Sequence, residues 1–219
     1  MSNHLHIEIQ KTKKRLLKLS AYVEETLRLA IKAYNHSDLE LAEKVMKDDD
    51  IIDQQELDIE EECLKILALY QPVATDLRFI VAVLKINSDL ERIGDHAASM
   101  ANRTVKIANA PKQNERRISI EEISELTISM LKKSIDALVS HDTELAYTVF
   151  EVEKVVNKLN KKVFTYFVEN AQNDVASVEA TAYEMFVARY LERIADHAVN
   201  IAEDVIYMIK GDIVRHQIS

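Results

Sequence analysis

The sequence predicts an all-α fold of two tandem three-helix bundles, and three observations lead to this prediction. Only two glycines and two prolines occur in 219 residues, whereas sheets with tight turns need many residues that tolerate positive φ or cannot continue a helix. Apolar residues recur with helical spacing along nearly the whole chain. The second half also repeats a distinctive stretch of the first half, as expected for a duplicated bundle.

Breaks in the helical periodicity place the elements in order. In the first half we expect helices over about 5–34, 38–70 and 73–109, with Ser37 or Asp38 as the cap of the second and Pro72 in the first turn of the third. The segment 110–114 breaks the pattern and is the predicted linker. In the second half we expect helices over about 119–139, 142–170 and 174–210, with His141 and Asp142 at a helix cap. Short connections between long helices are typical of antiparallel bundles, which gives domains 1–110 and 111–219.

Composition narrows the class of protein. The net charge of −9 repels phosphate backbones, so nucleic acid is not an expected ligand. The single cysteine, Cys63, cannot form an internal disulfide and is expected as a buried apolar residue in a reducing compartment. The longest apolar run, 79–84, is far shorter than the roughly 20 residues that span a bilayer. We therefore expect a cytoplasmic protein that meets a membrane only through partners.

The repeat is clearest on the third and sixth predicted helices. Residues 90–97 read Leu-Glu-Arg-Ile-Gly-Asp-His-Ala, and residues 191–198 match them except that Ala195 replaces Gly94. A glycine inside a helix weakens it, so Gly94 is expected to relieve a steric conflict with a neighbouring helix. His96 and His197 lie about 100° around the helix from the preceding aspartates, which favours a structural or surface role over metal binding.

Acidic residues border the core face on these helices. Glu91 and Asp95 are four residues apart and share one face, and the second copy places Glu192 and Asp196 there, with Glu203 further along. The neighbouring helices carry a matching stripe, strong in the first copy and weaker in the second, made of Asp49, Asp53, Glu56 and Glu60 and of Glu153, Asn157 and Asn160. Facing carboxylates repel one another unless cations lie between them, and carboxylate oxygens suit Mg, Mn, Fe or Ca. The alternatives are a solvated surface, or local neutralisation by Arg92 and Arg193.

Patterns typical of enzymes are mostly missing. The chain has no Gly-rich phosphate loop, no Gly-x-Ser-x-Gly elbow and no His-Glu-x-x-His helix. A carboxylate–metal phosphohydrolase remains an alternative, although the sequence offers no convincing general base for it. A purely structural helical dimer is the second alternative.

Residues 68–80 and 84–97 closely resemble the PhoU family of bacterial phosphate-signalling regulators, and the likeness extends over both halves. The resemblance implies two tandem three-helix bundles, a homodimer and no enzymatic activity. It also implies a negative regulator of phosphate uptake and of the phosphate-starvation response. Such a regulator acts between the ATPase of a phosphate ABC transporter and a sensor histidine kinase.

The resemblance further implies multinuclear iron or zinc sites at an acidic motif, with Mg or Mn as other candidates. Carried over by position, the motif falls on Asp49, Asp53, Glu91 and Asp95 in the first bundle and on Glu153, Asn157, Glu192 and Asp196 in the second. Asn157 departs from the motif because an amide is a weaker, neutral ligand. We therefore expect tighter metal binding in the first bundle.

Overall fold

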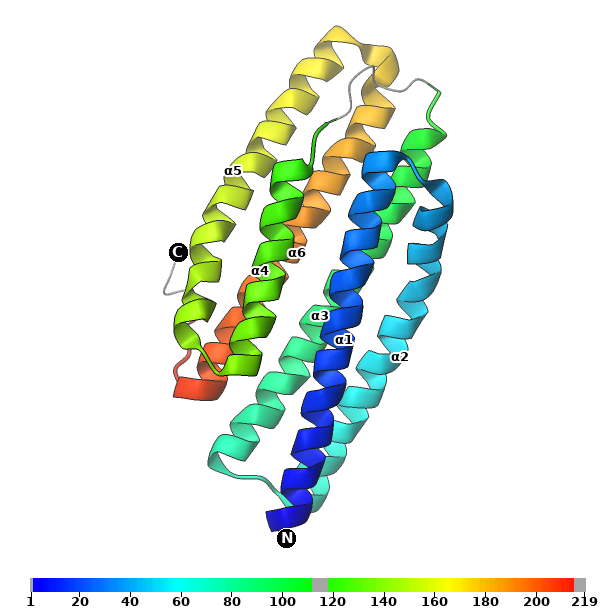
Figure 1. Cartoon of the computed structure of the whole chain (residues 1–219). Coiled ribbons are helices and arrows are strands. Elements are labelled where there is room, and N and C mark those ends of the chain that lie inside the picture. The colour runs from blue at the N-terminus through cyan, green and yellow to red at the C-terminus, as the bar shows by residue number, and fades with distance from the viewer. Residues whose placement is uncertain (1, 112–117, 215–219) are drawn as a thin grey trace.

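The computed structural model describes residues 2–111 and 118–214, which form six long α-helices and no strand (Figure 1). The helices are α1 (Ser2–His36), α2 (Leu39–Tyr70), α3 (Ala74–Ala108), α4 (Glu121–Ser140), α5 (Thr143–Asn173) and α6 (Val178–Lys210), with a 3-10 turn, η1 (Val175–Ser177), before α6. The predicted all-α fold is confirmed. Among these residues no helix contains an apolar stretch long enough to cross a membrane.

The helices form two three-helix bundles that lie side by side (Figure 1). α1, α2 and α3 make the first bundle, and α4, α5 and α6 make the second. α3 packs against α6 and α1 packs against α4, so a single hydrophobic core runs through both bundles. In the described parts of the chain, α2 and α5 contact only elements of their own half, and they lie on opposite outer sides of the molecule. The predicted linker lies largely outside the described residues, and the domain boundary at 110/111 stays a prediction.

An aspartate caps the N-terminus of the second helix in each bundle, Asp38 in α2 and Asp142 in α5. Asp38 accepts a hydrogen bond from the backbone N of Leu41 at 3.0 Å, and Asp142 accepts from the backbone N of Glu144 at 2.9 Å. Each carboxylate satisfies a backbone N–H that the first helical turn leaves without a partner. The residues before them, Ser37 and His141, each have φ of 55° and turn the chain between the helices. The predicted cap at Asp142 is confirmed, and Asp38 rather than Ser37 caps α2.

Two predicted helix starts are wrong. Pro72 precedes α3 instead of lying in its first turn, because Val73 takes an extended conformation, with φ of −127°, as the N-cap. α6 begins at Val178 instead of at 174, because α5 continues to Asn173 and η1 follows. The Asn170 side chain holds this turn by donating hydrogen bonds to Oγ of Ser177 at 3.2 Å and to Oγ1 of Thr181 at 2.9 Å.

Ile118, where the described part of the chain resumes after the linker, is hydrogen-bonded to both bundles. The Tyr34 hydroxyl of α1 donates a hydrogen bond to the carbonyl of Ile118 at 2.9 Å. The N–H of Ile118 donates to Oε2 of Glu184 on α6 at 3.1 Å. Tyr34 and Glu184 are both buried, so Ile118 fixes the register between α1 and α6.

Candidate metal site

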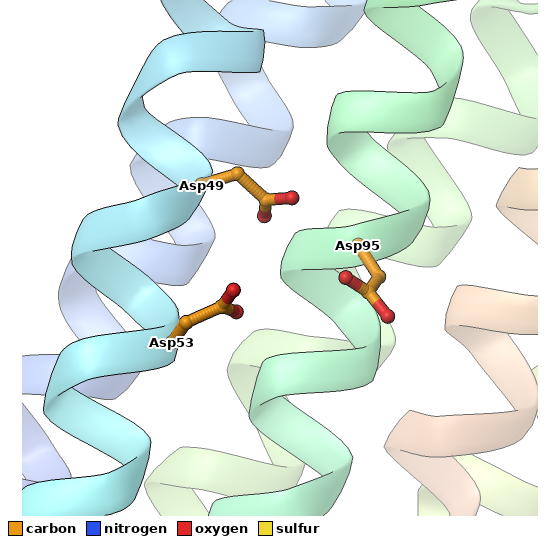
Figure 2. A group of neighbouring side chains, drawn as sticks. All are labelled: Asp49, Asp53 and Asp95. Atoms are coloured by element: carbon orange, nitrogen blue, oxygen red, sulfur yellow. The ribbon is translucent and has the colours of Figure 1, made fainter.

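Three aspartates meet between α2 and α3. Asp49 and Asp53 lie on one face of α2 because they are four residues apart, and their side chains point toward Asp95 on α3 (Figure 2). One carboxylate oxygen from each residue lies within 4.8 Å of the other two. We call this group the aspartate triad. Three oxygens that converge from two helices can bind one cation and thereby hold the helices together.

A glycine brings the two helices this close. A Cβ placed on Gly94 would lie 2.7 Å from Cδ1 of Ile52 and 3.5 Å from Oδ1 of Asp49. Ile52 is fully buried on α2, so it has little space to move away. The expected steric role of Gly94 is therefore confirmed. The glycine permits the backbone of α3 to approach α2 beside the triad.

Asp49 has an unusual electrostatic environment. Its Oδ1 atom is buried and has no hydrogen-bond partner among the described residues. Burial raises the pKa of Asp49 to about 6, and the negative charges of Asp95 and Asp53 act in the same direction. A buried acceptor without a donor is costly, and a carboxylate beside two others repels them. A cation placed here would relieve both costs, so the triad fits a metal ion.

Glu91 lies beside the triad without belonging to it. Burial raises the pKa of Glu91, and the charge of Asp95 acts in the same direction. Arg92 contacts Oε2 of Glu91 at 3.4 Å and Oδ2 of Asp95 at 3.1 Å. The alternative of local neutralisation by Arg92 thus holds for part of the site. Arg92 is exposed, and exposed ion pairs contribute only about 0–1 kcal/mol, so a bound cation can compete with it for Asp95.

Further along the seam between α2 and α3, Glu56 of the acidic stripe is hydrogen-bonded to Asn87. The Asn87 side chain of α3 is fully buried and donates to the backbone carbonyl of Glu56 at 2.9 Å and to its Oε1 at 3.1 Å. Asn87 lies one turn before Glu91, and sequence reasoning did not single it out. Its place just before the repeated motif is the only signal in the sequence. Asn87 and Glu56 fix the register of α2 against α3 next to the triad.

The equivalent seam between α5 and α6 is arranged differently. Asn157 donates a hydrogen bond to Oε1 of Glu153 at 3.4 Å, and Asn160 donates to Oε2 of Glu192 at 2.9 Å. Burial, followed by the charges of Glu192 and Glu153, raises the pKa of Asp196 to about 6. Within the described residues, three acidic groups converge only in the first bundle. The amides therefore take up carboxylate oxygens that a cation would otherwise need.

The arginine partner in the second bundle was predicted incorrectly. The alternative from the sequence was neutralisation of Glu192 and Asp196 by Arg193, but Arg189, one turn earlier on α6, pairs with Glu192. Arg193 instead lines a groove that faces α3. The physical reason is the position of Arg193 on the side of α6 that packs toward the other bundle, which the helical wheel of one bundle does not reveal.

His96 and His197 meet across the contact between α3 and α6. Their ring centroids are 5.5 Å apart, and His96 also stacks on Tyr190. His197 Nδ1 bonds Oδ1 of Asp89 at 2.7 Å, and Asn200 donates to the same oxygen at 3.0 Å. Burial and the neighbouring His197 lower the pKa of His96 to about 4. The expected structural role of the two histidines is confirmed, because they join the two bundles.

The fold and these seams define a class of protein in which a three-helix bundle occurs twice and acidic residues line the last helix of each copy. The profile of the PhoU domain matches residues 16–104 and again residues 120–205. The chain therefore belongs to the PhoU family.

Relatives match this chain over nearly its full length. It is 40% identical over 214 residues to a phosphate-specific transport system accessory protein PhoU homolog of Aquifex aeolicus, covering 96% of this chain and 95% of the relative. It is 34% identical to the homolog of the same name from Pseudomonas aeruginosa, covering 99% and 89% of the two chains.

Solved structures agree with the fold. The crystal structure of PhoU from Pseudomonas aeruginosa matches with a TM-score of 0.90 at 34% identity, covering 94% of this chain and 99% of that one. The phosphate transport system regulatory protein PhoU from Streptococcus pneumoniae matches with a TM-score of 0.87 at 26% identity, covering 96% and 99%.

Proposed function

We propose that this chain is a regulatory accessory protein of a phosphate-specific transport system, and that it represses phosphate uptake and the phosphate-starvation response. The observation that supports this most is the family match in both halves, together with relatives of nearly equal length that are named accessory proteins of that system. In this proposal the protein is a non-enzymatic adaptor in the cytoplasm. It connects the ATPase of the transporter with a sensor histidine kinase.

Two outer faces are suitable for such partners. α2 exposes Leu57 and Leu64, which are seven residues apart and lie on one face, and α5 exposes Phe164 and Val168, which are four residues apart. Exposed apolar side chains that gather on one face are typical of protein–protein contacts. Because α2 and α5 lie on opposite sides of the molecule, one chain can contact two proteins at once. We place the contacts with the ATPase, the histidine kinase and the second copy of a homodimer on these faces.

The aspartate triad is the proposed metal site of this regulator, with Glu91 at its edge. A bound cation would neutralise the carboxylates and stabilise the close contact of α2 with α3. The donors are all carboxylate oxygens, which suit iron, manganese or magnesium better than zinc, because zinc in proteins mostly takes nitrogen and sulfur ligands. Glu153, Asn157, Glu192 and Asp196 form a weaker second site.

The regulatory role is tested in a strain that lacks the gene and carries a phosphate-starvation reporter. The parent protein should restore repression at high phosphate and should co-purify with the transporter ATPase. Leu64→Glu on α2 and Phe164→Glu on α5 should each reduce capture of one partner. Val139→Glu on α4 is the control, because Val139 is 47% exposed, close to the 53% of Leu64 and the 57% of Phe164, and it should leave capture unchanged. Normal repression in the strain without the gene would contradict the proposal.

A further inference from the structure

A groove between the two bundles gathers positive charge. It has a volume of about 910 Å³ and is bounded by residues of α2, α3 and α6. Its cationic residues come from the last half of α3 and from the middle of α6, and they are Arg92, Arg103, Lys106, Arg189 and Arg193. The chain as a whole carries a net charge of −9. Two carboxylates, Asp49 and Asp95, also line the groove, so cations outnumber anions there in a protein that is acidic overall, and such a local reversal of charge attracts anions.

Carboxylates pair with only some of these cations. Arg92 pairs with Glu91 and Asp95, and Arg189 pairs with Glu192. In the part of the chain that the structure describes, no carboxylate lies at ion-pair distance from the other three, which are Arg103, Lys106 and Arg193. Like charges that share a groove repel one another, so an anion between them would lower the electrostatic energy.

Aromatic side chains hold Arg103 in place at the groove. Its guanidinium carbon lies 5.2 Å from the ring centroid of Phe186 and 5.6 Å from that of Tyr183, and its Nη2 donates to the Tyr190 hydroxyl at 3.5 Å. The Nε atom is buried and has no hydrogen-bond partner among the described residues. A buried donor without an acceptor costs free energy. Because Nε is closed to solvent, a bound anion would meet the other N–H groups of a guanidinium that the aromatic rings already hold in position.

The other residues that line the groove indicate where an anion would bind. Asp49 and Asp95 form one wall and would repel an anion. The three cations without a carboxylate partner line the groove together with the polar side chains of Ser99 and Asn102. Arginine offers planar, paired N–H donors that match phosphate oxygens, and a groove of this size is much larger than one phosphate group.

We propose that this groove binds a small anion with more than one phosphate group, either an inorganic polyphosphate or a nucleoside polyphosphate. Arg103, Lys106 and Arg193 bind the phosphate oxygens. The exposed ring of Phe186 provides an apolar surface for the base of a nucleotide. The three cations are not part of the aspartate triad, but Asp49 and Asp95 line the same groove, so the test is made on metal-free protein.

The test is isothermal titration calorimetry of the full chain in buffer with EDTA, using ATP, tripolyphosphate and orthophosphate as probes. We expect ATP or tripolyphosphate to bind at least about tenfold more tightly than orthophosphate. Tighter binding of ATP than of tripolyphosphate assigns the site to nucleotides, and equal or weaker binding assigns it to inorganic polyphosphate. Arg193→Gln and Lys106→Gln should each weaken binding at least about fivefold, with the melting temperature unchanged.

The matched control is Lys132→Gln, which removes an exposed charge from α4, away from the groove. It should bind the probes as the parent does. The proposal is overturned if no probe binds at millimolar concentration, if orthophosphate binds as tightly as the polyphosphates, or if Lys132→Gln weakens binding as much as Arg193→Gln. The chelator removes metal from all arms, so these outcomes leave the metal site to be tested separately.

Discussion

Asp49 on α2 and Asp95 on α3 place carboxylate oxygens within 4.8 Å of each other across the seam of the first bundle. The charge of Asp95 is, after burial itself, the largest cause of the raised pKa of Asp49. The seam that joins the two helices therefore contains a built-in repulsion in the absence of a cation.

The stability of the metal-free protein should depend on pH through Asp49. Its pKa is about 6 in the folded protein against an ordinary value of 3.8 for an aspartic acid, so the folded protein holds this proton more tightly than the unfolded chain. Stability is therefore lost as the pH rises from 3.8 to above 6. Because Asp49 is partly exposed, we expect this contribution to be about 1–2 kcal/mol. Urea unfolding at pH 4.5 and pH 7 measures it.

Asp49→Asn is the matching variant, because the amide keeps the shape and loses the charge. It should remove that part of the pH dependence and leave the metal-free protein at least as stable as the parent at pH 7. Asp142→Asn at the start of α5 changes a carboxylate far from the triad and serves as the control. An unchanged difference between the two pH values in Asp49→Asn would contradict the repulsion.

Gly94→Ala should damage the metal site more than the fold. Alanine gains about 1 kcal/mol of helix propensity over glycine, whereas the added methyl group overpacks Ile52 at a cost of about 1–3 kcal/mol. The displaced helix should weaken metal binding by several-fold. The double variant Gly94→Ala with Ile52→Val lacks the Cδ1 atom that the methyl group meets, and it should recover much of the loss.

The control for Gly94 lies in the second repeat. Ala195→Gly makes the reverse change at the equivalent position on α6 and should cost about 1 kcal/mol of stability without changing metal affinity in the first bundle. Equal metal affinity for Gly94→Ala and the parent would show that close helix approach is not required.

Asn157→Asp should strengthen the second site. The change restores the carboxylate that the acidic motif has in the first bundle and removes the amide that donates to Glu153. The additional negative charge should destabilise the metal-free protein at pH 7 and should add bound metal when iron or manganese is supplied. Elemental analysis of the metal content per chain checks this, with Asn160→Asp on the same helix as the comparison variant. If Asn157→Asp binds no more metal than the parent, the two seams differ in geometry and the prediction is wrong.

Tyr34→Phe should loosen the connection between the bundles. The variant loses only the hydroxyl that donates to Ile118, and removing one buried hydrogen bond of this kind costs about 1–2 kcal/mol. Hydrogen exchange at the start of α4 should accelerate, while exchange within α2 should stay as in the parent. Uniform acceleration along the chain would instead indicate a global loss of stability.

The sequence was sufficient to predict the helices and the acidic seams. Helical periodicity placed the six helices, and the repeated motif placed Glu91 and Asp95 on the same face as Glu192 and Asp196. Asp142 was recognisable as a helix cap because its carboxylate follows a break in the pattern. Pro72 and the start of α6 were misplaced because the local conformation depends on single hydrogen bonds, such as those of Asn170, that periodicity does not encode.

The contact between the bundles was not predictable in the same way. α3 and α6 bury side chains on more than one face, so their sequences do not specify which helix covers which face. For this reason the groove was missed, although Arg103 and Lys106 lie three residues apart and therefore on one face of α3. That Asp95, and not Glu91, belongs to the triad was not predictable either, because the sequence does not specify the rotation of α3 against α2.

The central claim is that the aspartate triad binds a hard cation, and elemental analysis of protein purified without chelator or metal-affinity tag tests it most directly. The parent should contain iron, manganese or magnesium, Asp49→Asn and Asp95→Asn should each lose most of it, and Glu153→Gln should retain it. A parent that contains no metal and takes none up on titration, or triad variants with the parent's metal content, would contradict the account.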